Sequence, residues 1–196
     1  MFLRPKSLKI TLIITAFCLA NTCASYAAED GFGPSKRVEG KHFIVYYTPI
    51  IEIEDITQQL SINYTDKLLA GNLSKKDQPY YNELARMIDT LFIKICDILD
   101  MPLYSFQGNI KICKDFSQLK QIYFNLFAKE MANSPSFYVD DLNTIYITQD
   151  SFKKEILGHE IAHAIISRYF VVLPPEKVQE ILSMYVEYQL SDTKNK

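Results

Sequence analysis

The sequence predicts an α+β domain built on a small sheet that is mixed or antiparallel. Short segments dense in β-branched and aromatic residues recur along the chain, which is typical of strands. Longer segments between them repeat apolar residues every three or four positions, which is typical of helices. The chain has 196 residues, of which 48% are hydrophobic, so it can bury the core of one modest domain.

The first 27 residues have the organisation of a secretory signal peptide. Basic residues among the first nine precede an apolar run over 10–20, and Ser25 and Ala27 supply the small residues of a cleavage site after Ala27. An uncleaved anchor is the alternative, although the run is short for a membrane span. We therefore expect a secreted or periplasmic protein that has no membrane segment after signal cleavage.

Charge and cysteine content further narrow the classes of protein to which the chain could belong. Lys and Arg total 21 against 23 Asp and Glu, with no basic cluster, which argues against nucleic-acid binding. Two cysteines, Cys96 and Cys113, lie outside the signal segment. In an oxidising compartment they could form a disulfide, and buried free thiols are the alternative.

The expected domain spans residues 41–191. Residues 28–40 contain Gly, Pro34 and several charges, so we expect a linker or an N-terminal tail there. Residues 192–196 form a polar tail. Strands are expected at 42–48, 109–113, 137–139 and 144–148.

Helices are expected from apolar periodicity together with capping residues. Asp115 can cap one helix, Asp150 or Ser151 can cap another, and Pro174 and Pro175 suit the first turn of the last one. The expected helices span 55–70, 79–99, 116 to about 132, 152 to about 170, and 174 to about 190.

The chemistry of the chain is concentrated in the segment His159-Glu160-Ile161-Ala162-His163. On a helix, residues four apart lie on one face, so both imidazoles can reach one zinc ion. Glu160 is rotated by about 100° from His159 and can reach a water on the metal, for which it would act as general base. The surrounding residues are apolar almost all round the helix, which predicts burial. A pair of hydrogen-bonded core histidines is the alternative.

Zinc needs a third protein ligand. The remaining histidine, His42, lies far away at a strand start and is expected to be an ordinary surface or core residue. Glu176, Glu180 and Glu187 all fall near one stripe of the last helix, so periodicity alone does not choose among them.

The chain resembles the small gluzincin (thermolysin-like, MA clan) zinc metallopeptidases over residues 159–188. Their pattern is His-Glu-x-x-His, a Leu-Pro pair, then Glu-Gly-Leu-Ala-x-Tyr, and the chain has Leu173-Pro174 and then 180–185, Glu-Ile-Leu-Ser-Met-Tyr. The resemblance implies a zincin-like domain in which Glu180 is the third zinc ligand. Glu176 is then expected to face solvent in the first helical turn, and Glu187 to lie at the surface near the helix end.

Two positions depart from the pattern of that family. Ile181 stands where the family often has Gly, and Met184 stands where thermolysin has an Asp that supports the first histidine.

The resemblance also locates the substrate. The strand before the motif helix, 144–148, would border the cleft and pair with an extended peptide. Tyr146, Tyr185 and Tyr188 are candidates by position alone for stabilising the oxyanion.

We therefore expect a secreted zinc-dependent endopeptidase that holds one Zn²⁺ and acts on a peptide or protein substrate. The alternative is a catalytically inactive zincin-fold protein of the cell envelope, with a binding or regulatory role and a structural zinc. A maturation chaperone acting on one partner is a third interpretation.

Overall fold

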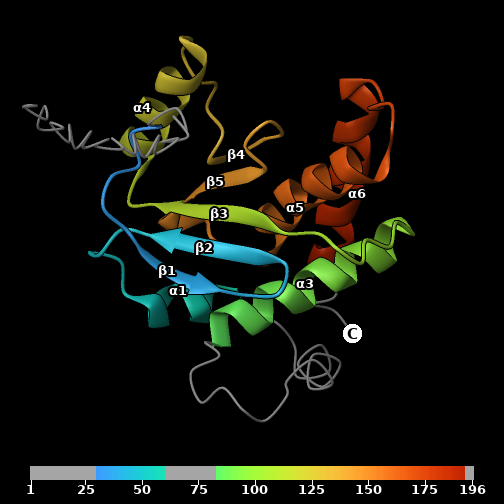
Figure 1. Cartoon of the computed structure of the whole chain (residues 1–196), viewed down its shortest axis with the longest axis horizontal. Helices are drawn as coiled ribbons and strands as arrows, with labels where there is room; N and C mark the ends of the chain where they lie inside the picture. The colour runs from blue at the N-terminus through green and yellow to red at the C-terminus, as the bar shows by residue number, and fades with distance from the viewer. Residues whose placement is uncertain (1–29, 61–82, 193–196) are drawn as a thin grey trace, which may run out of the picture.

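The computed structural model describes residues 30–60 and 83–192, which form five helices and one mixed five-stranded sheet (Figure 1). The α+β class predicted from the sequence is therefore confirmed. The proposed signal segment, the proposed polar tail from 193 onwards and parts of the first two expected helices lie outside the described residues. No helix in the described ranges has the length and apolarity needed to cross a membrane.

The sheet has the strand order β1-β2-β3-β5-β4. Its three central strands run parallel, and each edge strand runs antiparallel to its neighbour. The sheet is thus mixed rather than wholly antiparallel. The strands are β1 Lys36–Glu39, β2 Phe43–Tyr47, β3 Gly108–Cys113, β4 Ser136–Val139 and β5 Thr144–Thr148.

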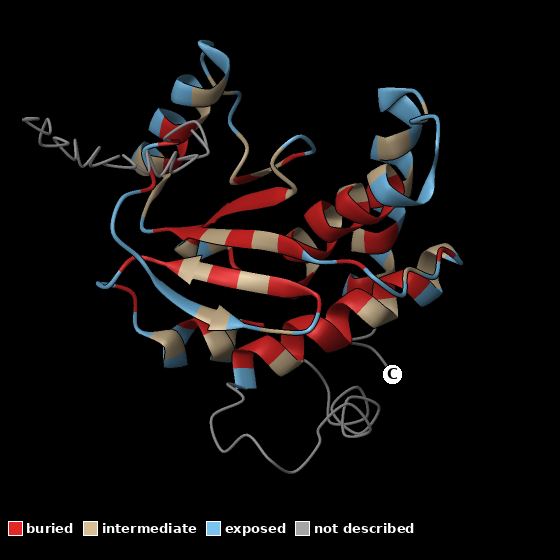
Figure 2. Cartoon of the chain, viewed as in Figure 1, coloured by how far each residue is buried: buried red, intermediate tan, exposed pale blue. Residues whose placement is uncertain are grey.

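Helices cover both faces of this sheet, and the larger core lies on one side (Figures 1 and 2). Val45, Ile110 and Ile145 point to that side because alternate strand residues face opposite ways. Helix α4 covers the other face, where Tyr146 and Phe137 stack at 4.9 Å. The helices are α1 Ile53–Gln59, α3 Glu83–Leu99, α4 Phe116–Phe127, α5 Lys154–Tyr169 and α6 Glu176–Asp192.

The segment expected to be a linker or tail differs from that expectation. Lys36–Glu39 form β1, in register with β2, and Val38 lies opposite Val45. Further upstream, Asp30 and Phe32 are buried. The sequence signal was weak because β1 is a short edge strand with mostly exposed, charged residues.

Helix boundaries follow local backbone chemistry. Asp115 caps α4 as predicted, since its carboxylate accepts a hydrogen bond from the Gln118 N–H at 2.8 Å. The helix ends at Phe127, about five residues earlier than expected, because Ala128 is left-handed (φ 51°). The expected cap of α5 is wrong: Asp150 lies in a short 3₁₀ turn, Gln149–Ser151, and no side chain caps the helix.

The cysteines and His42 are structural. Cys96 and Cys113 are buried free thiols in different core clusters, so the structure contains the thiol alternative and no disulfide between them. Burial raises the pKa of Cys113 to about 12, which keeps this thiol protonated. His42 stacks on Phe92 at 4.3 Å, as expected of a core residue.

Candidate metal centre

Two adjacent helices bring the predicted ligands together. His159 and His163 lie one turn apart on α5, and Glu180 reaches them from α6. The two Nε2 atoms are 3.2 Å apart. Oε2 of Glu180 lies 3.6 Å from Nε2 of His159, and its Oε1 lies 3.4 Å from Nε2 of His163.

These donor atoms have the spacing of ligands around a metal ion. One ligand atom from each of His159, His163 and Glu180 can be chosen so that all lie within 4.8 Å of one another. Ligands of a tetrahedral zinc, with bonds of about 2.0–2.1 Å, are about 3.3 Å apart. The observed contacts of 3.2–3.6 Å match that spacing. The group can therefore hold a metal ion.

The electrostatics of the site favour a neutral imidazole at His163. Burial, and then the nearby His159, lower the pKa of His163 to about 4, although Glu180 opposes this shift. A neutral imidazole is the form that binds a metal, because its nitrogen lone pair is free.

Glu160 is buried in the wall of the same site. Its side chain points to the edge strand, where the Ser136 hydroxyl donates a 2.7 Å hydrogen bond to Oε1. Burial raises the pKa of Glu160 to about 7, the Ser136 bond lowers it, and the charges of Glu180 and Glu187 raise it further. No signal in the sequence pointed to Ser136, because its contact depends on strand register.

Glu187 is not the plain surface residue expected from its position near the end of the helix. Its Oε2 lies 3.3 Å from Nδ1 of His159, at ion-pair distance though without hydrogen-bond geometry. Glu180 and Glu187 are seven residues apart, about two turns of α6, so both face α5. Glu176, in contrast, is exposed in the first turn, as expected.

The site opens into a cleft of about 440 Å³. Strand β4 and the loop before it form one wall, and α5 and α6 form the other. Its lining includes Tyr123, Ser136, Tyr138, His159, Glu160 and Glu180.

The edge strand that borders the cleft is β4, not the strand predicted from the resemblance. Strand β5, Thr144–Thr148, pairs with β3 on one side and β4 on the other, and all five of its residues are buried. It has no free edge for a peptide. Among the described residues no strand pairs with the outer edge of β4, Ser136–Val139. A sequence cannot show which of two adjacent strands ends the sheet.

The tyrosine candidates do not converge on the site. The Tyr146 hydroxyl donates a 2.7 Å hydrogen bond to Asp30 on the opposite face of the sheet. Tyr185 and Tyr188 are exposed on α6. The tyrosines that do line the cleft are Tyr123 and Tyr138, which were not predicted.

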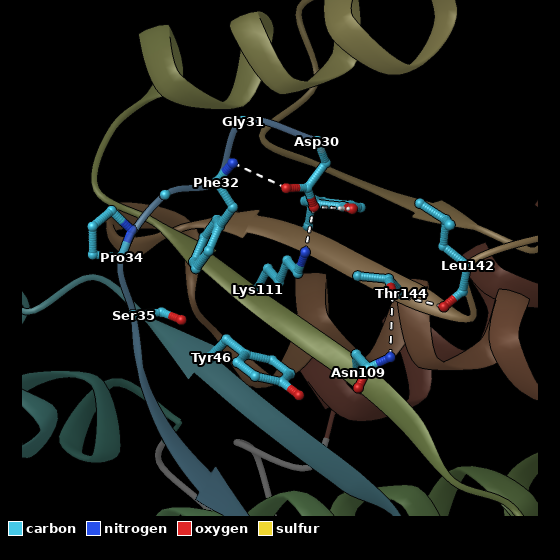
Figure 3. Close-up of a pocket in the computed structure, with 12 residues that line it drawn as sticks. Asp30, Gly31, Phe32, Pro34, Ser35, Tyr46, Asn109, Lys111, Leu142 and Thr144 are labelled. Carbon is cyan, nitrogen blue, oxygen red and sulfur yellow. Dashed lines mark hydrogen bonds and ion pairs between the residues drawn. The ribbon is translucent and has the colours of Figure 1, made fainter. Parts of the chain in front are cut away.

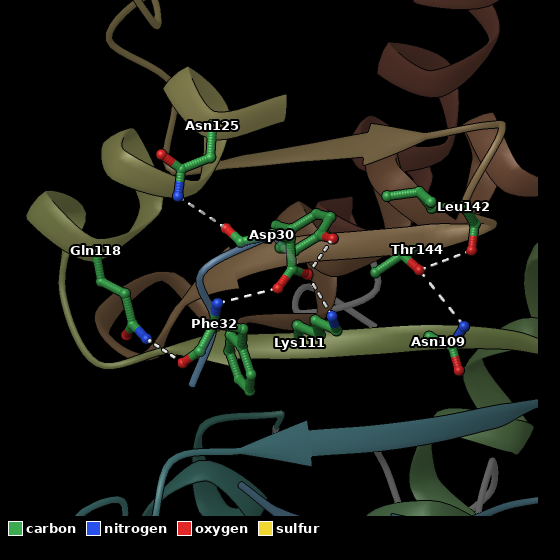
Figure 4. Close-up of polar contacts among 9 residues, drawn as sticks. Asp30, Phe32, Asn109, Lys111, Gln118, Asn125, Leu142 and Thr144 are labelled. Carbon is green, nitrogen blue, oxygen red and sulfur yellow. Dashed lines mark hydrogen bonds and ion pairs between the residues drawn. The ribbon is translucent and has the colours of Figure 1, made fainter. Parts of the chain in front are cut away.

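A larger hollow of about 620 Å³ lies on the α4 face, away from the histidines (Figure 3). Its charged groups are already paired: Asp30 accepts from Lys111, from Tyr146 and from the Phe32 N–H. The side-chain amide of Asn109 also donates a hydrogen bond to the Thr144 hydroxyl (Figure 4). This network joins the start of the described chain to the sheet and uses the charged groups of the hollow for structure. The smaller cleft is therefore the candidate site.

Comparison of the chain with protein-family models, with curated proteins and with solved structures finds no match. The candidate site therefore stands on its own geometry: a mixed α+β chain with a His159–His163–Glu180 group that can hold a metal ion.

Proposed function

We propose that the protein is a thermolysin-like zinc endopeptidase of the zincin fold. The observation that carries the proposal is the 3.2–3.6 Å spacing of three nitrogen and oxygen donors beside a buried glutamate in an open cleft. His159, His163 and Glu180 would hold the ion. Two imidazoles and one carboxylate, with a fourth position left open, are the ligand set of catalytic zinc sites.

When bound, zinc would polarise the scissile carbonyl and acidify a water molecule. Glu160 would accept the proton of that water and deliver it to the leaving amine. The Ser136 hydrogen bond supports this role, because it ties one carboxylate oxygen to β4 and leaves the other available to the cleft.

We propose that an extended peptide or protein segment binds along β4. Its backbone would pair with the outer edge of the strand, which gives affinity without requiring a particular sequence. Tyr123 and Tyr138 would contact its side chains, since both line the cleft.

We also propose that the chain is exported and cleaved near Ala27. The support is the order of charged, apolar and small residues at its N-terminus. Mass spectrometry of the exported protein should find a chain that begins near Ala28, and retention of Met1 would instead indicate an anchor.

The decisive experiment combines metal analysis with a hydrolysis assay on the exported chain. We expect about one equivalent of zinc per chain and cleavage of an unfolded substrate such as casein, abolished by a chelator and restored by zinc. Less than about a tenth of an equivalent after zinc is supplied would refute the metal site. Zinc binding without hydrolysis would support the alternative, a binding or regulatory protein of the envelope.

A further inference from the structure

We propose that Glu187 is the positioning residue for His159, in place of the Asp that thermolysin carries where this chain has Met184. The inference rests on the proposed metal site. It concerns which carboxylate fixes the ring of the first histidine, a role that Met184 cannot fill because a thioether is at most a weak acceptor.

The two ring nitrogens of His159 face different partners. Nε2 lies near His163 and Glu180, at 3.2 and 3.6 Å, whereas Nδ1 lies 3.3 Å from Oε2 of Glu187. Glu187 therefore contacts a different ring nitrogen of His159 from the one that faces His163 and Glu180, the other proposed ligands. It occupies the outer side of the ring, where metal-binding histidines usually meet a carboxylate.

This arrangement indicates which ring nitrogen of His159 carries a hydrogen. A carboxylate oxygen can only accept, so a hydrogen bond closed across this 3.3 Å contact requires the hydrogen on Nδ1 of His159. Nε2 of His159 then carries a lone pair, and in the metal-free protein it accepts from the Nε2–H of His163 at 3.2 Å. Glu187 thus selects the tautomer whose free nitrogen points toward Glu180.

Partial burial of His159 makes solvent screening of this contact weaker than for a fully exposed ion pair. The His159 side chain is 20% exposed and that of Glu187 is 46% exposed, so water reaches the carboxylate more readily than the imidazole. Outer carboxylates of this kind typically change metal affinity about 10–100-fold.

The first measurement needs no metal. Long-range ¹H–¹⁵N NMR of metal-free, histidine-labelled protein at pH 8 reads the tautomer of each of the three histidines, with His159→Gln for assignment. We expect His159 as the Nδ1–H tautomer in the parent protein and loss of that preference in Glu187→Ala. Glu187→Gln should keep it, because the amide oxygen still accepts. An Nε2–H tautomer in the parent, or an unchanged tautomer in Glu187→Ala, overturns the inference.

The second measurement is zinc affinity by competition titration of the same variants. We expect Glu187→Ala to bind about 10–100-fold more weakly and Glu187→Gln to lose much less. Glu176→Ala removes the same charge from the same helix and should match the parent in both measurements. Equal losses in Glu187→Gln and Glu187→Ala would show a charge effect alone and would contradict positioning.

The two measurements separate the inference from the proposed function. If no variant and no parent binds zinc, the proposed function fails, yet a Glu187-dependent tautomer still establishes the positioning contact. If zinc binds and the tautomer is independent of Glu187, the proposed function stands and this inference fails.

Discussion

At the residue scale, the site depends on groups whose ordinary behaviour is changed by burial. Glu160 is 6% exposed and accepts a hydrogen bond from the Ser136 hydroxyl at 2.7 Å. Burying a carboxylate in this way costs free energy of folding, because an uncompensated buried charge is strongly destabilising. Its place in the cleft wall next to His159 is therefore more consistent with chemistry than with packing alone.

Replacing Glu160 by Gln should separate metal binding from hydrolysis. Gln keeps the size of the side chain and can still accept from Ser136, but it cannot take a proton from water. We expect Glu160→Gln to keep its zinc and to lose at least about 100-fold in casein hydrolysis. Glu54→Gln, at an exposed carboxylate on α1 that does not line the cleft, is the matched control and should retain full activity. An active Glu160→Gln protein would remove Glu160 from the general-base role.

At the element scale, the site depends on how closely α6 approaches α5. Gly158 precedes His159 at the helix contact, and a Cβ there would lie 2.3 Å from Cδ1 of Leu190. Leu190 is itself only 1% exposed and therefore has little room to move. Glycine costs about 1 kcal/mol in a helix relative to alanine, whereas overpacking costs about 1–3 kcal/mol, so close packing accounts for the glycine.

Gly158→Val should therefore damage both stability and the metal site. We expect a loss of roughly 2–3 kcal/mol in the free energy of unfolding, measured by urea denaturation, because Leu190 and α6 must shift. Since α6 carries Glu180, zinc affinity should also fall about tenfold or more. Valine placed near the exposed end of α5, by Tyr169→Val, should cost less than about 1 kcal/mol, because Tyr169 is 43% exposed. Equal stability of the two variants would contradict the close-packing account.

At the scale of the whole molecule, the start of the described chain is tied across the sheet. Asp30 accepts hydrogen bonds from Lys111 on β3 and Tyr146 on β5. From α4, Gln118 donates to the Phe32 carbonyl and Asn125 donates to the Asp30 carbonyl (Figure 4). The segment thus joins α4 to the sheet, and α4 in turn supplies Tyr123 to the cleft.

This anchor should make stability depend on acid. Burial alone would raise the pKa of Asp30, but the hydrogen bonds from Lys111, Tyr146 and the Phe32 N–H outweigh it and hold the pKa below its ordinary value. The stabilisation is therefore present above the unfolded pKa of about 4 and is lost as pH falls through the lower native value.

Urea denaturation of the parent and of Asp30→Asn at pH 7 and at pH 3 measures this contribution. We expect the parent to be more stable at pH 7 by roughly 2 kcal/mol, the size of a charge-assisted hydrogen bond, and the difference to shrink at pH 3. Glu39→Gln is the control, because its ion pair with Arg37 is exposed and should contribute less than about 1 kcal/mol. A difference that is the same at both pH values would rule out the ionised carboxylate as its source.

Local pattern determined much of what could be predicted. The strand at Thr144–Thr148 and the start of α4 at Asp115 follow from residue type over a few positions, as does the i, i+4 placement of His159 and His163. These features depend on backbone propensity and helix period, which neighbouring residues largely decide. The resemblance to gluzincins proposed Glu180, and the structure brings Glu180 to both histidines.

Tertiary structure decided the rest, because it sets contacts between residues far apart in the chain. Strand order makes β4 the edge of the sheet and places Ser136 against Glu160, 24 residues away. Helix packing brings Glu187 to the outer nitrogen of His159, although its position near a helix end suggested a surface role. Such contacts depend on register and crossing geometry, which arise from burying whole faces of elements and leave no signal in local spacing.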